Sequence, residues 1–205
     1  MQQPRYDIEG RYQSLLAAGE TLLCEGYDQA QPKRIAKAAG VSVGLFYKHF
    51  SSKRELLTAV MVHRLGRLHQ LIENAVADEP SPERSLVAVI AQTLAYFQTH
   101  QGLAKLFFMQ IGYGDEQATE QMSEARASYR RILRSVIEGG IQQKHFLAME
   151  PLEIETLVSS IVGSINWTIY EQLVVKQHNI DPQVMTDRLV VFFLRGIQLE
   201  SVDGG

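Results

Sequence analysis

The stretch GVSVGLFYKHF, at residues 40–50, mixes residue types that suit contact with a polyanion. Lys48 and His49 can donate hydrogen bonds to phosphate oxygens, whereas Phe46 and Phe50 are side chains of a packed core. Neither a fully buried helix nor a fully solvated one accounts for this mixture. We therefore expect a short helix with one packed face and one face turned toward a polar partner.

Positive charge is concentrated around this stretch. The whole chain of 205 residues has a net charge of -3. Residues 33–67 contain eight basic residues and one acidic residue, giving +7, while residues 68–205 contain ten basic and seventeen acidic residues, giving -7. A basic segment on an acidic body indicates a polyanion partner at one end. On the charge count alone, a solvated charged surface would give the same pattern.

The elements that must hold this stretch are all helical. Apolar residues recur at helical spacing in every long segment, and no segment alternates as a strand does. Proline, glycine and capping residues predict helices at about 7–25, 32–39, 43–49, 53–77, 82–100, from 102 to about 112–114, 115–138, 151–177 and 182–199. We predict an all-α protein of about nine helices, with a small N-terminal three-helix helix-turn-helix domain and a larger C-terminal helical bundle.

Local signals refine these boundaries. Gly40-Val41-Ser42 is a three-residue turn containing glycine, as in helix-turn-helix motifs, whose second helix enters the major groove of DNA. Ser52 and Glu55 have the spacing of a capping box, and Gly139-Gly140 is expected to stop a helix. The segment DEPSPER, at 78–84, is the expected boundary between the N-terminal part of the chain, called the head, and the larger C-terminal helical bundle, called the body.

Helical geometry separates the residues of the predicted second helix of the motif. At 100° per residue, Phe46 and Phe50 fall on one side, where they can pack on the rest of the head. The opposite side and its two edges carry Gly44, Leu45, Lys48, Val43, Tyr47 and His49.

The run EGYDQAQPKRIAKAAGVSVGLFYKHFSSKRELLTAV resembles the N-terminal domain of TetR-family transcriptional regulators. The matching positions are Gly26-Tyr27, Ile35-Ala36, Ala39-Gly40-Val41-Ser42, Tyr47, His49-Phe50, Lys53 and Leu56-Leu57. The resemblance implies a DNA-binding domain at 1–52, a linking helix at 53–77 and a ligand-binding and dimerisation domain at 78–205.

The resemblance also implies roles for single residues. Ser42 would cap the recognition helix and turn its N-terminus toward phosphate, and Val43, Gly44, Leu45 and Lys48 would lie against base edges. Phosphate contacts would come from Tyr47, His49 and Lys53. Pro32 departs from the family, which often has a phosphate-binding threonine nearby, so Lys33 would take more of that role. Packing for Tyr47 and a plain surface position for His49 are the alternatives.

The last two predicted helices, 151–177 and 182–199, are apolar around much of their circumference. In TetR-like proteins the final two helices form a four-helix dimer interface, so the resemblance implies a homodimer on a palindromic DNA operator. Burial inside a larger monomeric core is the alternative.

Aromatic and methionine residues of the body could line an effector cavity. The resemblance implies that an effector is held there, and such a lining suits a small apolar or aromatic molecule. The candidates are Phe97, Phe108, Met109, Met122, Tyr129, Trp167 and Tyr170. Ordinary core packing would explain each of them equally well.

The expected function is that of a ligand-responsive DNA-binding repressor, released from its operator by the effector. A TetR-type activator, or an all-α lipid or small-molecule carrier or enzyme, is the alternative. The sequence shows no Ser/His/Asp or Cys/His grouping of a catalytic site, and its six histidines lack metal-ligand spacing. We therefore expect no enzyme activity, metal or cofactor. With one cysteine, no signal peptide and no apolar membrane span, we expect a cytoplasmic protein with no membrane partner.

Overall fold

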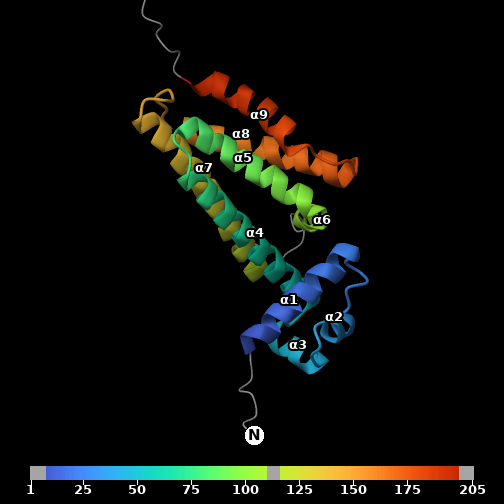
Figure 1. Cartoon of the computed structure of the whole chain (residues 1–205). Coiled ribbons are helices and arrows are strands. Elements are labelled where there is room, and N and C mark those ends of the chain that lie inside the picture. The colour runs from blue at the N-terminus through green and yellow to red at the C-terminus, as the bar shows by residue number, and fades with distance from the viewer. Residues whose placement is uncertain (1–7, 110–115, 199–205) are drawn as a thin grey trace, which may run out of the picture. The chain divides into compact units, whose positions relative to one another are not determined.

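The computed structural model describes residues 8–109 and 116–198, and the side chains of 9–108 and 120–198. Apart from an isolated bridge between Phe146 and Gln198, these ranges contain no strand. The prediction of an all-α fold with nine helices is confirmed for them (Figure 1). The helices are α1 (Ile8–Glu25), α2 (Pro32–Ala38), α3 (Val43–His49), α4 (Lys53–Ala77), α5 (Pro82–Thr99), α6 (Gln101–Met109), α7 (Glu116–Gln142), α8 (Pro151–Ile169) and α9 (Pro182–Ile197).

The chain divides into two compact units. Unit 1 comprises residues 1–65 and 105–123, and unit 2 comprises 66–104 and 124–205. The predicted linking segment is one continuous helix, α4, which contributes its first half to unit 1 and its second half to unit 2. The predicted division at residues 52 and 77 stays a prediction.

In unit 1, α2 packs against both α1 and α3. The core beneath them is formed by fully buried side chains from all four helices, among them Leu15, Leu23, Ile35, Phe46 and Leu56. Gly19 lets α1 approach α4 closely, because a Cβ atom there would lie 2.6 Å from Cδ2 of Leu56. This approach packs α4 closely against α1.

The turn between α2 and α3 depends on glycine. Gly40 has φ +69°, a left-handed conformation that costs other residues free energy. Its N–H donates to the carbonyl of Lys37, and the N–H of Val41 donates to that of Ala36, which together form a Schellman motif. The α2 helix therefore ends abruptly, and the chain turns directly into α3.

The start of α4 differs from the predicted capping box. The N–H of Glu55 donates to Oγ of Ser52 at 3.1 Å, as expected. The Glu55 carboxylate, however, accepts from the N–H and hydroxyl of Ser51, at 2.6 and 2.7 Å, and not from the N–H of Ser52. The reciprocal bond is displaced by one residue, because the Ser51 backbone and hydroxyl together offer the carboxylate two donors.

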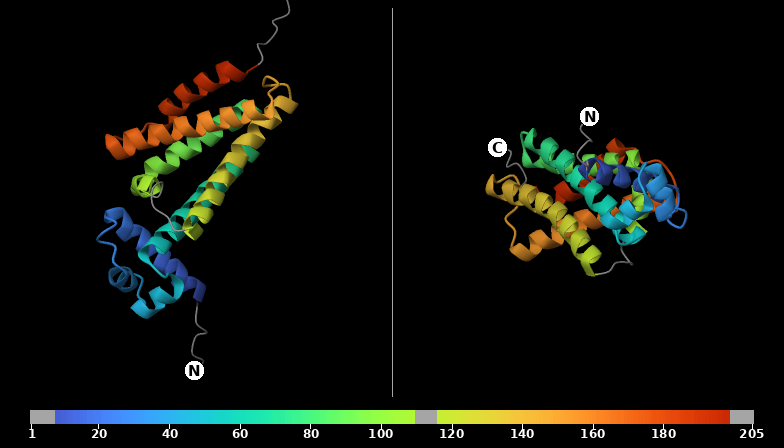
Figure 2. Two further views of the ribbon diagram at one scale, coloured as in Figure 1. Left: turned by 180° about the vertical axis from the view of Figure 1, so that it is seen from behind. Right: turned by 90° about the horizontal axis from the view of Figure 1, so that it is seen from below.

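In unit 2, α5 packs against α8 and α9, and the second half of α4 lies beside α7 (Figures 1 and 2). The α5 helix supplies much of this core, with ten buried residues. Its buried apolar side chains include Leu86, Val89, Ile90, Leu94 and Phe97. In the part of the chain that the structure describes, no helix is both long and apolar enough to cross a membrane.

The prediction that Gly139-Gly140 stops a helix is wrong, since α7 continues to Gln142. Gly140 serves packing instead: a Cβ atom there would lie 2.2 Å from the ring of Phe146, which is 1 % exposed. The chain leaves the helix a few residues later, where Lys144 has φ 60°.

The predicted helix 151–177 is α-helical only to Ile169 and continues as a π-helix over Tyr170–Val175. The connection that follows is held by side chains from elsewhere in unit 2. Oε1 of the Gln98 side chain accepts from the N–H of Ile180 at 2.6 Å. The side-chain Nε2 atoms of Gln98 and Gln101 donate to Oδ1 of Asn179 at 3.1 and 2.7 Å. These bonds tie the connection between α8 and α9 to α5 and the start of α6.

Candidate functional site

Helix α3 is stabilised by a cap at its N-terminus and by two buried aromatic rings on its packed face. Ser42 Oγ accepts from the N–H of Leu45 at 3.1 Å, which caps the first turn. Phe46 and Phe50 are 0 % and 2 % exposed, and their ring centroids lie 5.8 Å apart. The predicted separation of this helix into a packed face and an outward face is therefore confirmed for the two phenylalanines.

The outward face carries most of the predicted base-contacting residues. Val43, Gly44 and Lys48 are exposed, and Leu45 is half-buried. Tyr47 is 54 % exposed, and its ring is nearly perpendicular to the Phe46 ring, with 5.2 Å between the centroids. A hydroxyl on an exposed ring is free to reach a partner beyond the head.

His49 is half-buried on the opposite edge of α3. Its ring centroid lies 5.8 Å from that of Tyr12, and both side chains line a cavity of about 490 Å³ that also borders Glu55. Burial raises the pKa of Tyr12, and the negative charges of Glu9 and Glu55 raise it further. The His49 ring thus packs against Tyr12 of α1, and the contact of His49 with phosphate stays a prediction.

Lys53 makes two contacts that sequence reasoning missed. Its Nζ donates to the backbone carbonyl of Tyr27 at 2.6 Å and lies 3.9 Å from the centroid of the Tyr27 ring. A lysine ammonium has three N–H groups, so two remain for another acceptor. The Gly26-Tyr27 pair was visible in the motif, but nothing in its spacing indicated this partner.

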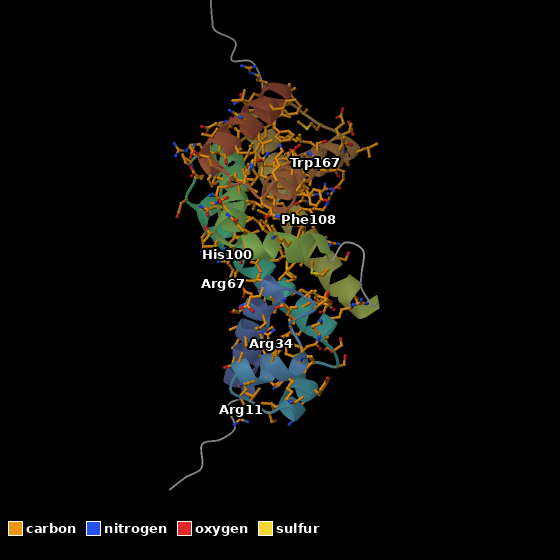
Figure 3. All side chains as sticks on the ribbon, turned by 90° about the vertical axis from the view of Figure 1, so that its right-hand side faces the viewer. Arg11, Arg34, Arg67, His100, Phe108 and Trp167 are labelled. Atoms are coloured by element: carbon orange, nitrogen blue, oxygen red, sulfur yellow. The ribbon has the colours of Figure 1, made fainter. Side chains whose placement is uncertain are left out.

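Positive charge remains on α2 and α3 after pairing within the head. Arg64 is neutralised by Glu20 at 2.6 Å, and Arg34 lies 4.0 Å from Glu25. Lys33, Lys37 and Lys48 are exposed and form no ion pair with any described residue. Figure 3 labels Arg34 on the same short helix as Lys33 and Lys37. The remaining charge lies on the two helices of the motif, where a polyanion can neutralise it.

The predicted effector residues are divided between the two units. Phe108, half-buried, and Met122, buried, belong to unit 1, whereas Phe97, Tyr129, Trp167 and Tyr170 belong to unit 2; the Met109 side chain lies outside the described residues. Trp167, labelled in Figure 3, is 63 % exposed and stands 5.8 Å from the Tyr170 ring. Phe97 is buried against Tyr96.

Unit 2 also contains a polar cluster that the apolar patterns concealed. Tyr129 on α7 shares a hydrogen bond of 2.9 Å with Thr93 on α5, and the Tyr129 ring centroid lies 6.1 Å from that of His69 on α4. His69 and Thr93 are 8 % and 4 % exposed. Each of these residues is a single polar position in a long helix, and nothing in the sequence indicated that the three would lie together.

Large apolar side chains are exposed along α8, the π-helix and α9. They are Leu152, Trp167, Val175, Val184, Val191 and Phe192. Between Leu152 and Trp167, the exposed stripe of α8 consists of small residues, including Ser159, Ser160 and Gly163. No described atom outside the helix's own backbone and nearest neighbours lies within 4 Å of a Cβ built on Gly163. This combination leaves room for another helix to approach.

Two family models match the chain. The family described as "Bacterial regulatory proteins, tetR family" matches residues 15–60, which span α1 to the start of α4. The "Tetracyclin repressor-like, C-terminal domain" matches residues 79–170, which span α5 to the end of α8. Together they cover the helix-turn-helix and most of unit 2.

Named relatives agree with these matches. The fatty acid metabolism regulator protein of Bacillus subtilis is 24% identical over 160 residues, 78% of this chain and 81% of the relative. The transcriptional activator FasR of Mycolicibacterium smegmatis is 30% identical over 117 residues, 57% of this chain and 53% of the relative. The crystal structure of the regulator FadR from Bacillus subtilis in complex with stearoyl-CoA superposes with a TM-score of 0.79 at 22% identity, covering 91% of this chain and 100% of that one.

Proposed function

The chain belongs to the TetR family of bacterial regulatory proteins and is a DNA-binding transcriptional regulator, not an enzyme. From this premise we propose that it is a homodimeric repressor, released from a palindromic operator by a long-chain fatty acyl effector. The observation that carries the proposal is the capped, outward-facing α3 beside the exposed lysines of α2 and α3.

The outward face of α3 reads the major groove in this proposal. Lys48 donates to guanine O6 or N7, the commonest specific contact of a lysine with a base, and Val43 or Leu45 contacts a thymine methyl group. Gly44 lets the backbone approach the bases. Ser42 presents the N-terminus of α3 to phosphate, and phosphate contacts come from Lys33, Tyr47, His49 and the remaining N–H groups of Lys53.

A homodimer is supported by the exposed apolar side chains of α8 and α9. Exposed apolar surface gathered on two neighbouring helices is typical of an interface. A two-fold dimer places two copies of α3 on half-sites one DNA turn apart, about 34–36 Å, or a multiple of that distance.

Substitution of Gly163 by Glu tests the dimer. The position is open within the chain, so the fold tolerates a side chain, but a carboxylate facing its own copy across the interface separates the subunits. Sedimentation equilibrium is expected to give a monomer for Gly163→Glu and a dimer for wild type. Gly66→Glu is the control, because that helical glycine is equally open and lies on α4.

A fatty acyl effector is supported by the relatives. One is named a fatty acid metabolism regulator, and another was crystallised with stearoyl-CoA. The apolar core of unit 2 suits a hydrocarbon chain. The effector must bind the DNA-releasing conformation more tightly than the DNA-binding one, by about 1–3 kcal/mol, to act as a switch.

Operator binding and release provide the test. Operator fragments selected from genomic DNA are titrated with the protein by fluorescence anisotropy at 50 and 200 mM salt, with and without palmitoyl-CoA. We expect palindrome-specific binding, a steep loss of affinity with salt and release by palmitoyl-CoA. Salt-insensitive binding without sequence preference would contradict the DNA-reading role, whereas specific binding without release would contradict only the effector class.

Lysine variants separate base reading from phosphate contact in the same assay. Lys48→Ala is expected to lower the preference for the operator over scrambled DNA by about 1–3 kcal/mol. Lys33→Ala is expected to weaken binding to both DNAs equally and to flatten the salt dependence by about one unit of slope. An unchanged operator preference for Lys48→Ala would exclude it as a base contact.

Activation of transcription is the second candidate, because one relative is named an activator. Deletion of the gene discriminates the two. Expression from the operator-bearing promoter is expected to rise in the deletion strain if the protein is a repressor and to fall if it is an activator.

A further inference from the structure

Buried polar groups in unit 2 meet between three helices: His69 on α4, Thr93 on α5 and Tyr129 on α7. We propose that His69 is the polar anchor for the uncharged acyl oxygen of the effector, with Nε2 of His69 as the hydrogen-bond donor. The assignment rests on the proposed function and names the ligand chemistry of its effector site.

The directions of the hydrogen bonds follow from counting protons. The Thr93 hydroxyl donates to the carbonyl of Val89 at 2.7 Å, and a carbonyl only accepts. That bond uses the only proton of the Thr93 hydroxyl, so in the 2.9 Å pair Tyr129 must be the donor. The Tyr129 hydroxyl therefore has no proton left for a ligand oxygen, which leaves His69 as the candidate donor of the cluster.

His69 has an unused nitrogen in the same region. Its side chain is 8 % exposed, and Nε2 is buried with no hydrogen-bond partner among the described residues. A buried polar atom without a partner destabilises a fold, and most such atoms are satisfied. A ligand that accepts a hydrogen bond from Nε2 would supply the missing partner and explain why an imidazole occupies this buried position.

The cluster selects an uncharged ligand atom. Burial lowers the pKa of His69, while Glu73 acts in the opposite direction and Arg131 in the same direction, so the imidazole is neutral at neutral pH. Burial likewise raises the pKa of Tyr129 to about 12, despite its hydrogen bond to Thr93. A carboxylate would bring a charge into this neutral cluster, whereas the carbonyl of an ester or thioester accepts a hydrogen bond without one.

A groove lies about one helical turn from the cluster. This groove of about 390 Å³ lies between α4 and α7, lined by Glu73, Val76, Ala77, Ser128, Arg131, Ile132, Ser135 and Val136. Glu73 is one helical turn beyond His69, and Ile132 is close to one turn beyond Tyr129. A second cavity of about 200 Å³ shares Val76, Ser135 and Val136 with the first. In this proposal the acyl chain of the effector runs from His69 along the groove between the two helices.

Two matched ligands test the anchor on the full-length protein. Palmitoyl-CoA has the thioester carbonyl, and S-hexadecyl-CoA has a methylene group in its place. Isothermal titration calorimetry with wild type is expected to show roughly 10-fold tighter binding of palmitoyl-CoA, the effect of one hydrogen bond to a buried donor. Palmitate, a carboxylate with the same chain, is expected to bind more weakly than palmitoyl-CoA.

Variants of His69 complete the test. In His69→Phe the preference for the carbonyl is expected to vanish, and in His69→Gln, which retains an N–H donor, it is expected to return in part. His63→Phe, at an exposed position of the same helix, is expected to keep the wild-type preference. In the absence of ligand, His69→Phe is expected to melt about 2–4 °C higher than wild type, because it removes the unsatisfied nitrogen.

Each outcome bears on a different claim. Equal affinity of wild type for the two CoA ligands would overturn the anchor while leaving the effector class intact. A lower melting temperature of ligand-free His69→Phe would overturn it as well, since Nε2 would then have a structural partner. No binding of palmitoyl-CoA by wild type would refute the proposed effector class, and the anchor with it.

Discussion

The helix-turn-helix of unit 1 and the polar cluster of unit 2 place their polar side chains in opposite ways. In unit 1, Lys48 and Tyr47 face outward from a helix that two buried phenylalanines hold from beneath. In unit 2, His69 and Tyr129 face inward, between helices whose other buried residues are largely apolar. The first arrangement presents groups to a large partner, and the second can serve only a ligand small enough to enter.

The difference has an energetic consequence. The exposed lysines on α2 and α3 cost the fold little free energy, because water solvates their ammonium groups. The Nε2 atom of His69 is buried without a hydrogen-bond partner among the described residues, and a buried unpaired polar atom destabilises the folded state. Substitution of the exposed residues of unit 1 should therefore change DNA binding with little change in stability, whereas substitution of His69 should change both stability and ligand binding.

The largest effect is expected for Phe46→Ala. Removal of a fully buried ring from beneath α3 is expected to cost about 3–5 kcal/mol and to abolish operator binding. Tyr47→Ala, at the exposed neighbour, is expected to change stability by less than about 0.5 kcal/mol while weakening DNA binding. Denaturant unfolding followed by circular dichroism, together with anisotropy titrations, measures both. Intact operator binding by Phe46→Ala would show that the two faces are not divided as described.

A smaller loss is expected for Gly140→Ala in unit 2. The new Cβ atom would overlap the buried Phe146 ring, and such overpacking costs about 1–3 kcal/mol. Gly139→Ala is the matched control, because its nearest neighbour outside the helix backbone would be Nε2 of Gln143 at 3.9 Å, and it is expected to stabilise α7 by about 0.5–1 kcal/mol. Melting curves of the two variants should shift in opposite directions.

Helix caps in the two units allow a comparison of about 1 kcal/mol. Ser42→Ala removes the 3.1 Å cap of α3 and is expected to lower stability by about 1 kcal/mol and to weaken operator binding. Ser81→Ala removes the 3.4 Å cap of α5, so its cost is expected to be smaller and DNA binding is expected to stay unchanged. Equal effects of both variants on DNA binding would indicate that the Ser42 cap has no special role at the DNA.

The smallest effect concerns pH. Because the pKa of His69 is lowered in the folded state, the unfolded chain takes up its proton first as the pH falls below 6.5. The free energy of unfolding is therefore expected to decrease as the pH falls through this region and to show no contribution from His69 above it. Urea titrations at several pH values check this, and His69→Phe is expected to lose that part of the pH dependence. An identical slope in the variant would assign the pH dependence to other groups.

Much of unit 1 could be predicted from the sequence because its signals are local. Pro32 begins α2, Gly40 supplies the left-handed turn, and Ser42 caps α3, so neighbouring residues determine each boundary. The spacing of Phe46 and Phe50 fixed the buried face in advance. The contact of Lys53 with Tyr27 was missed, since it joins residues 26 positions apart.

In unit 2 the sequence by itself determined the helices, their apolar stripes and most of their boundaries, because helical periodicity repeats within each segment. Only the tertiary structure decided which polar groups meet. Three contacts each join separate helices or loops. They are the packing of Phe146 on Gly140, the hydrogen bond of Gln98 to Ile180 in the connection before α9, and the ring contact of His69 with Tyr129. Such contacts depend on how helices pack against one another, and no pattern within a single helix encodes that.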